Sequence, residues 1–522
     1  MLAVGLPGTA LPQSPVSATG NGGSLAAPGQ LPTLGDGSDL SIGAERRLGD
    51  RIAREIYHDP DYLDDPVVAE YVQGIWQPLL AAARARGDLN SEMAERFAWE
   101  IMMGRDRSIN AFALPGGYLG LHLGLVAAVS NRDELASVLA HELSHVSQRH
   151  ISRLMSKQSQ QTPWVIGAMI LGALAANKNP DMANAMIVGG QAVAIQSQLN
   201  FSRDMEREAD RIGFGIMTQA GFEPRGFVSM FEKLQQSSRL NDNGAFPYLR
   251  SHPLTTERMA DMQSRQGMGG AAVEAAPAGA EHALVSARAR VLSNPGIDEL
   301  RVRIQEADPL RNPEATGARQ LGVLYAATLA ALRLRDFPVA RSLQVRLTRF
   351  AQSEPGAARL VRLLAAEIDL AEFDGQVDQL PLELRAWAAG SGLAGAASGI
   401  ARPELFLSSS VLLRTGQAAQ AAQQLQSWVA LHPRDAQAWQ ALSLASAAQG
   451  QTLRAIRADA EAQLALLDYS AAADRLKAAQ DLVRQMLRPG ASGVVPDHIE
   501  ASIIDTRARH VQSLLREQAL ER

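Results

Sequence analysis

Hydrophobic and polar positions divide the chain into a leading segment, a mixed domain and a long helical region. Residues 1–39 are rich in Gly, Pro, Ser and Ala and follow neither a helical nor a strand period. From Leu40 the apolar positions become periodic, and beyond Ala283 nearly all of the chain has a helix-forming pattern. The predicted parts are a flexible lead or signal remnant (1–39), a first domain (40–267), a linker (268–282), a helical domain (283–488) and a tail helix (489–522).

The first domain combines helices with a small sheet. Asp133–His150 has the pattern of a strong amphipathic helix, and Arg203–Gly221 is a second helix that ends at its glycine. Apolar and Gly-Gly signals at Phe97–Met103 and Ala111–Gly120 are typical of short strands. The pattern therefore predicts an α+β domain that is mostly helical, with a small edge sheet.

Two apolar helical segments, Trp164–Ala176 and Ala183–Ala194, lie between these two helices in the sequence. The first has about 13 residues, which is short of the roughly 20 that span a bilayer. The pair can be core helices, a movable lid over a cleft, or a contact to a membrane surface. We favour a lid whose apolar surface partly faces a membrane or another protein.

The helical region carries a loose internal repeat. Gly416 and Gly450 stand in similar contexts 34 residues apart, which is the tetratricopeptide period, and Pro433 lies between them. Weaker copies surround Arg335–Pro338 and Phe373–Gly375. The repeat predicts an all-α, tetratricopeptide-like solenoid, and the alternative is an alanine-rich helical bundle.

Composition narrows the possible chemistry. The chain of 522 residues has no cysteine, which excludes disulfides, thiolate metal sites and cysteine nucleophiles. Any metal must therefore be held by histidines and carboxylates. The formal net charge of −5 gives no basic field for nucleic acid, so no nucleic-acid partner is expected.

The segment His141–His145 reads His-Glu-Leu-Ser-His, which is the HExxH pattern. On a helix, His141 and His145 lie on one face, so both imidazoles can bind one metal ion. Glu142 lies beside them, where a carboxylate can take a proton from a water at the metal. The pattern predicts a zinc site with a glutamate as its general base.

A catalytic zinc site needs a third protein ligand and an open position for water. The histidine that a metzincin would place ten residues after His141 is Ile151, and His150 misses that position by one. Glu206 and Asp210 share a face of a later helix, so Glu206 can ligate zinc while Asp210 orients an imidazole. Glu208 lies on another side of that helix and is predicted to be solvated.

Four segments in this order carry a family resemblance. They are Asn110–Gly117, the HExxH motif, Glu206–Asp210, and the run His252–Arg258, which begins His-Pro. Together they resemble the HtpX-like zinc metalloproteases, in particular a soluble periplasmic branch with C-terminal tetratricopeptide repeats. The resemblance is strong over about residues 31–267 and implies a gluzincin-type metalloprotease domain followed by a repeat solenoid.

The resemblance also implies roles for individual residues. One Zn²⁺ per chain would be held by His141, His145 and Glu206, with Glu142 as the general base. His252 would take the fourth metal position and keep the enzyme inactive, and Arg258 would stand beside the site and stabilise the transition state. Extended substrate would pair as a strand near Phe112–Leu121, contacting Asn110, Ala111 and Phe112, with an edge strand expected at Leu119–His122.

The expected function is endopeptidase activity against misfolded or stalled envelope proteins, in outer-membrane protein quality control. The repeat domain would dock the outer-membrane assembly machinery, and a peripheral membrane contact is possible through the apolar pair. The start of the chain lacks an intact secretory signal, whereas the resemblance indicates the periplasm. The alternative is a chaperone or assembly scaffold in which proteolysis is secondary.

Overall fold

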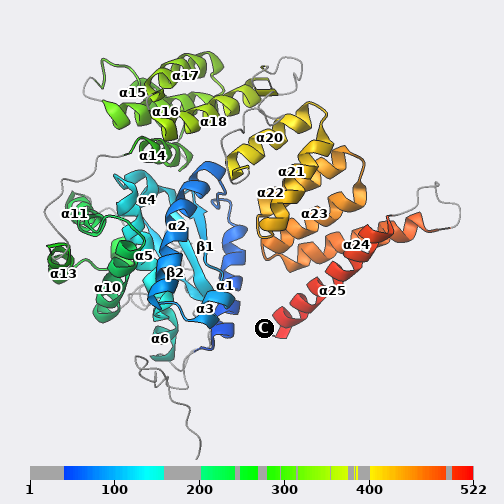
Figure 1. Ribbon diagram of the computed structural model, residues 1–522, viewed down its shortest axis with the longest axis horizontal. Helices are drawn as coiled ribbons and strands as arrows, with labels where there is room; N and C mark the ends of the chain where they lie inside the picture. Colours follow the sequence, from blue (N-terminus) through cyan, green and yellow to red (C-terminus); the bar gives the residue numbers. More distant parts are fainter. Residues whose placement is uncertain are drawn as a thin grey trace, which may run out of the picture. The chain divides into compact units, whose positions relative to one another are not determined.

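Figure 1 shows the computed structural model, which describes residues 40–157, 202–240, 247–267, 279–293, 296–312, 316–352, 354–373, 381, 384–385, 400–488 and 497–520. The predicted lead and both apolar segments between Trp164 and Ala194 lie outside these residues. Within the described part of the chain, no helix is both long enough and apolar enough to cross a membrane.

The first domain is mostly helical, as the sequence predicts. Its helices are α1 (Ile42–Tyr57), α2 (Pro66–Arg86), α3 (Ser91–Arg96), α4 (Leu123–Ala128), α5 (Arg132–Ser147), α6 (His150–Lys157), α10 (Arg203–Gln219), α11 (Arg225–Leu240), α12 (Pro247–Ser251) and α13 (Thr256–Gly267). Side chains cap several of them: Ser41, Asn131 and Ser202 accept backbone N–H groups at the starts of α1, α5 and α10. The caps at Asn131 and Ser202 fix the first residues of α5 and α10, which carry the predicted ligands His141, His145 and Glu206.

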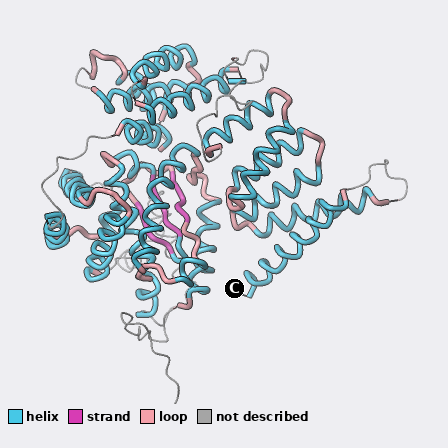
Figure 2. The backbone as a smooth tube through the Cα atoms, viewed as in Figure 1, coloured by secondary structure: helices cyan, strands magenta, loops and turns pink. Residues whose placement is uncertain are grey.

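The described sheet has three strands, β1 (Glu100–Gly104), β2 (Ala111–Leu114) and β3 (Tyr118–His122), drawn in magenta in Figure 2. The spatial order is β1-β3-β2, with β3 parallel to β1 and antiparallel to β2. The expectation of an edge strand at Leu119–His122 is therefore wrong, because this segment is the central strand. A turn at Pro115–Gly117, with Gly116 and Gly117 at positive φ, inserts β3 between its two neighbours.

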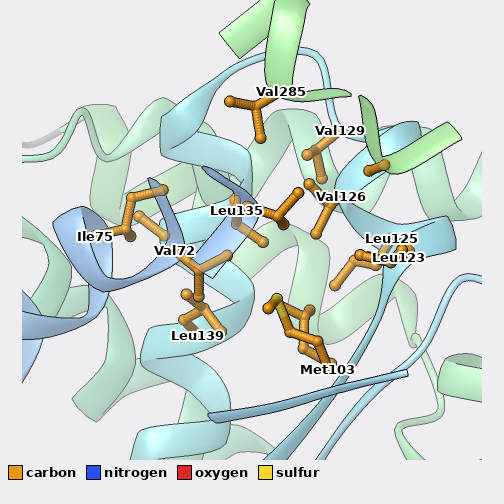
Figure 3. Packing of buried hydrophobic residues seen from close by; sticks show 14 of the residues in the cluster. Val72, Ile75, Met103, Leu123, Leu125, Val126, Val129, Leu135, Leu139 and Val285 are labelled. Atoms are coloured by element: carbon orange, nitrogen blue, oxygen red, sulfur yellow. The ribbon is translucent and has the colours of Figure 1, made fainter. Parts of the chain in front are cut away.

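The core of this domain is built around α5. Leu135 and Leu139 of α5 pack with Val72 and Ile75 of α2, and Met103 of β1 lies below them (Figure 3). Because nearly all of α5 is buried, its polar residues must find partners inside the protein.

The second half of the described chain is entirely helical. Its helices are α14 (Ala280–Leu292), α15 (Ile297–Glu306), α16 (Gly317–Arg333), α17 (Phe337–Ala351), α18 (Pro355–Glu372), α20 (Arg402–Arg414), α21 (Ala418–Leu431), α22 (Ala436–Ala448), α23 (Thr452–Ala465), α24 (Tyr469–Met486) and α25 (His498–Leu520). Gly416 and Gly450 occupy equivalent turns at φ +73° and +71°, each two residues past a helix end. The helix pairs agree with the sequence pattern, while their assignment as tetratricopeptide repeats stays a prediction.

Helix α14 belongs to the same hydrophobic core as the first domain. It begins at Ala280, inside the predicted linker, and its Leu284 and Val285 join the buried cluster that includes α2 and α5. The Arg288 guanidinium is buried and donates to both carboxylate oxygens of Asp65, the N-cap of α2. The hydrophobic core therefore continues across residue 283, where the composition of the sequence changes.

Candidate metal centre

The two histidines of the HExxH motif lie on one face of α5. Their side chains are buried, and the Nε2 atoms of His141 and His145 are 3.0 Å apart. This spacing follows from the i, i+4 geometry of a helix. The prediction that both imidazoles point to one place is confirmed by the geometry.

Helix α10 supplies a carboxylate to the same place. Glu206 lies 3.5 Å from Nε2 of His141 through Oε2 and 3.4 Å from Nε2 of His145 through Oε1. Helices α5 and α10 lie side by side (Figure 1), and Gly213 permits this approach, since a Cβ there would be 3.0 Å from the carbonyl oxygen of Ala140.

His252 completes a group of four potential ligands. Its Nδ1 lies 3.0 Å from Oε1 of Glu206 and 3.3 Å from Nε2 of His141. One ligand atom from each of His141, His145, Glu206 and His252 lies within 4.8 Å of the others, and all four residues are buried. Tyr248 stacks on the His252 ring at 4.6 Å between centroids and so helps to orient it.

Asp210 and Arg258 lie behind these ligands. Oδ1 of Asp210 is 2.9 Å from Nδ1 of His141, where the sequence places a carboxylate that orients an imidazole. Arg258 donates to both oxygens of Asp210, at 2.6 and 2.8 Å, and to the carbonyl oxygen of Pro253. Its Nη1 is also 2.8 Å from Oε2 of Glu206, so Arg258 lies beside the site, as predicted.

Glu142 is fully buried next to the four ligands. Its Oε1 is 3.4 Å from Nε2 of His252. Neither carboxylate oxygen accepts a hydrogen bond of normal geometry from the described residues, although the backbone of Ala113 faces it. Burial raises the pKa of the Glu142 carboxyl, against the opposing charges of His252 and His141. A buried carboxyl with a raised pKa suits a group that exchanges a proton.

The electrostatics of the group favour a positive charge at its centre. Burial alone would lower the pKa of His141, but its contacts with Asp210 and Glu206 outweigh burial and raise the pKa to about 9. Burial likewise opposes ionisation of Glu206, yet His252, His141 and His145 hold its pKa well below the ordinary value. A carboxylate kept ionised among three imidazoles is a donor set suited to a divalent cation.

Strand β2 passes beside Glu142. One edge of this strand pairs with β3, and its other edge points away from the described sheet. The N–H of His122 donates to the carbonyl oxygen of Asn110, and the register pairs Phe112 with Gly120. In an antiparallel pair the hydrogen-bonding residues alternate, so Ala111 and Ala113 direct their backbone groups to the outer edge. Of the predicted substrate contacts, Ala111 has this orientation, whereas the backbones of Asn110 and Phe112 face β3. Ala113, which lies inside the predicted pairing segment Phe112–Leu121, has the same orientation as Ala111.

Glu208, predicted to be solvated, keeps 37% of its side chain exposed and also has partners within the protein. Its Oε2 accepts from Nε2 of His150 at 3.1 Å and from Arg153 at 3.0 Å. His150, rejected above as a metal ligand, is buried, and its Nδ1 is 2.9 Å from Nδ1 of His145. Burial lowers the pKa of His150 to about 4. The helical wheel placed Glu208 correctly, but it carries no information on what packs against that side of α10.

Known proteins are similar to this chain over the part that holds the site. A family model described as peptidase family M48 matches residues 71–266. A putative beta-barrel assembly-enhancing protease of Vibrio cholerae is 36% identical over 240 residues, which are 46% of this chain and 48% of that protein. The beta-barrel assembly-enhancing protease of Escherichia coli K12 is 30% identical over 349 residues, 66% of either chain. The mitochondrial metalloendopeptidase OMA1 of Saccharomyces cerevisiae is 28% identical over 196 residues, 37% of this chain and 54% of that one.

The chain thus spans about half the length of the first of these relatives and about two thirds of the second. All of the residues that form the buried group, from His141 to Arg258, fall inside the range matched by the family model. The HExxH helix, the acidic helix after it and the His-Pro segment are the features on which the sequence resemblance rests. The chain belongs to peptidase family M48, a family of metallopeptidases.

Proposed function

We propose that this protein is a zinc-dependent endopeptidase that cleaves misfolded or stalled envelope proteins. The observation that carries the proposal is the buried group of His141, His145, Glu206 and His252 with Glu142 at its side. Three imidazoles and two carboxylates lie in one buried place beside the Arg258 guanidinium, and such groups are costly to bury unless they are paired or bind a metal ion.

The donor types fit zinc. Imidazole nitrogen and carboxylate oxygen are ordinary zinc ligands, and His141, His145 and Glu206 form the His₂Glu set of many zinc peptidases. One ion per chain would lie among these three residues. A bound Zn²⁺ would polarise the scissile carbonyl and lower the pKa of the attacking water toward about 7.

Glu142 would move the proton. Its carboxylate lies at the edge of the ligand group, where it can accept a proton from the attacking water and return it to the leaving amine. Arg258 would act on this site through Asp210 and Glu206, which its guanidinium holds beside the ligands, and any support of negative charge in the transition state would come from the same fixed positive charge.

The outer edge of β2 would bind the substrate backbone. An extended peptide would add as a strand beside Ala111 and Ala113, both of which are buried in the structure, so this edge would have to become accessible before substrate binds. Backbone pairing has little sequence preference, and it requires an unfolded or extended chain. The edge therefore supports misfolded proteins as the substrate class.

Removal of the metal tests the activity directly. A zinc chelator is expected to abolish cleavage of an unfolded substrate such as casein, and one equivalent of Zn²⁺ should restore it, because no residue of the group replaces the Lewis acid. Zinc content and casein cleavage are measured on the same samples, with a non-chelating isomer of the chelator as the control. Cleavage that continues in zinc-free protein would exclude the proposal.

His252 would hold the site closed. A fourth protein ligand leaves no position for water, and His252 lies close enough to Glu206 and His141 to serve as that ligand. Tyr248, stacked on its ring, would stabilise this closed arrangement.

The variant His252→Ala is expected to raise the rate of casein cleavage by about tenfold, because it frees the position that the water must occupy. The matched control is Tyr248→Phe, which keeps the aromatic stack and should stay close to wild type. Initial rates are compared at equal zinc content. A lower rate in His252→Ala with zinc retained would show that His252 assists the reaction instead.

The cellular role follows from the relatives. Two of them are named for enhancing beta-barrel assembly, so we place this protein in the periplasm, in quality control of outer-membrane proteins. The helical half would dock the assembly machinery as tetratricopeptide-like repeats. A peripheral membrane contact through 164–194 belongs to the same proposal and concerns residues outside those described.

A scaffold function is the second candidate. The helical half exposes large apolar side chains, among them Leu431 and Leu444, which could contact other proteins. The variant Glu142→Gln separates the two functions in cells that lack the wild-type gene. Full rescue by this variant would favour the scaffold, and no rescue would favour proteolysis.

A further inference from the structure

The two ligand histidines are supported from the same helix in two different ways. Nδ1 of His141 lies 2.9 Å from the carboxylate of Asp210 on α10. Nδ1 of His145 lies 2.9 Å from Nδ1 of His150, whose Nε2 is 3.1 Å from the carboxylate of Glu208 on α10. The first contact is direct, and the second passes through an additional imidazole.

The backbone places His150 for this contact. Helix α5 ends at Ser147, and Arg149 adopts φ +52°, a left-handed conformation that is uncommon for a residue with a side chain. The turn lets α6 begin at His150, so that its ring returns toward His145. Arg149 donates to Glu45 of α1 at 2.9 Å, and also to the carbonyl oxygen of Leu40. One contact to α1 and one to Leu40, which precedes that helix, thus hold a conformation that costs energy.

The hydrogen atoms along this chain follow from the requirement for a metal ligand. If Nε2 of His145 offers its lone pair to the metal, its Nδ1 carries the hydrogen and donates to Nδ1 of His150. Nε2 of His150 then carries a hydrogen and donates to Oε2 of Glu208. Every donor meets an acceptor in this arrangement, and Glu208 is held in turn by Arg153.

We propose that His150 and Glu208 are positioning residues, which fix the tautomer and orientation of His145 for metal binding. The proposal rests on the proposed function, in which His145 is a ligand. Helix α10 then supplies one ligand, Glu206, and the carboxylates that support both histidines of α5, Asp210 and Glu208. The acidic residues of Glu206–Asp210 thus have roles on two sides of α10. Glu206 and Asp210 face His141, and Glu208 faces His150.

The test measures zinc affinity of the full chain by competition with a chelator, together with the absorption spectrum of the Co²⁺-substituted protein. His150→Ala is expected to weaken zinc affinity by about 10- to 100-fold and to alter the spectrum, because the support of a ligand imidazole is worth that much. His150→Asn should recover most of the affinity, since Oδ1 of asparagine replaces Nδ1 as the acceptor. Glu208→Ala should weaken affinity in the wild-type background and have no effect in His150→Asn, whose shorter side chain does not reach Glu208.

The matched control is His282→Ala. His282 is also buried and has two polar contacts, with Tyr71 and the carbonyl oxygen of Val129, but it lies on α14. This variant should lose thermal stability and keep its zinc affinity and cobalt spectrum. If His150→Ala behaves in the same way, His150 is only structural and the proposal is wrong. If wild-type protein itself binds no zinc, the proposed function fails, which is a distinguishable result.

Discussion

The variant Glu142→Gln is expected to lose about 10²- to 10⁴-fold in peptide cleavage while the protein stays folded and keeps its zinc. The loss has this size because general acid–base catalysis contributes about that factor and glutamine cannot exchange a proton. The fold should not suffer, since neither oxygen of Glu142 accepts a hydrogen bond of normal geometry from the described residues. Burial raises the pKa of Glu142, so its ionised form is a cost to the folded state at neutral pH, which the amide removes.

The measurement combines cleavage rates, zinc content and the midpoint of thermal unfolding in zinc-free protein. Glu134→Gln is the matched control, because Glu134 is another buried glutamate of α5 and makes an ion pair of 2.6 Å with Lys233. It should show the opposite behaviour, with retained activity and a lower unfolding temperature. Wild-type activity in Glu142→Gln would contradict the mechanism, whatever its stability.

The ligand group was predictable because its geometry is mostly local. His141, His145 and Glu142 have fixed positions relative to one another on any helix, and Glu206 and Asp210 share a helix face for the same reason. Two features of the group are long-range: the packing of α5 against α10, and the approach of His252 from a third segment. The HExxH motif predicts the first of them, because a catalytic zinc needs a third protein ligand. The amphipathic pattern likewise located α5 and α10 to within a few residues.

The features that sequence reasoning missed are long-range or depend on one unusual backbone angle. The turn at Gly116 and Gly117 places β3 between β1 and β2. The sequence predicts a turn there, but it does not predict on which side of β2 the next strand pairs. The contact between His150 and His145 requires the left-handed Arg149, which no periodicity predicts. A helical wheel shows that Glu208 lies on a partly exposed side of α10, but it omits the partners that α6 brings to that side.

Sequence composition near the predicted domain boundary does not tell which helices pack together. A change in composition near residue 283 indicates a change in the type of sequence, but packing depends on which apolar faces meet. Leu284 and Val285 of α14 complete the core that α2 and α5 begin. Which helices bury the apolar face of α14 depends on the surfaces that lie next to it in the fold. The composition of the preceding linker carries no information about those surfaces.

The variant Arg258→Met is expected to lower the free energy of unfolding of zinc-free protein by about 3–5 kcal/mol. Arg258 is buried and forms a two-pronged ion pair with Asp210 while lying beside Glu206. Removing it leaves two carboxylates in the interior without their cation, and breaking a buried pair in this way has about that cost. The matched control is Arg211→Met, because the exposed pair of Arg211 and Asp261 joins the same two helices and should contribute less than about 1 kcal/mol.

The pH dependence of this difference gives a second readout. Burial alone would raise the pKa of Asp210, but Arg258 and His141 outweigh burial and lower it. A carboxyl whose pKa is depressed in the folded state stabilises the protein at neutral pH and loses that contribution as the pH falls through its folded pKa. The gap between wild type and Arg258→Met in urea unfolding should therefore narrow as the pH falls below about 4.

The double variant Asp210→Asn with Arg258→Met decides between two roles of the arginine. If Arg258 mainly neutralises buried carboxylates, removal of one charge should recover part of the lost stability, so the two effects will not add. If Arg258 only stabilises charge during the reaction, the single variant should unfold like wild type and lose cleavage alone. Because three of its nitrogens already bind Asp210 and Pro253 in the structure, we expect the first result, with the loss of activity following from the disturbed His141 and Glu206.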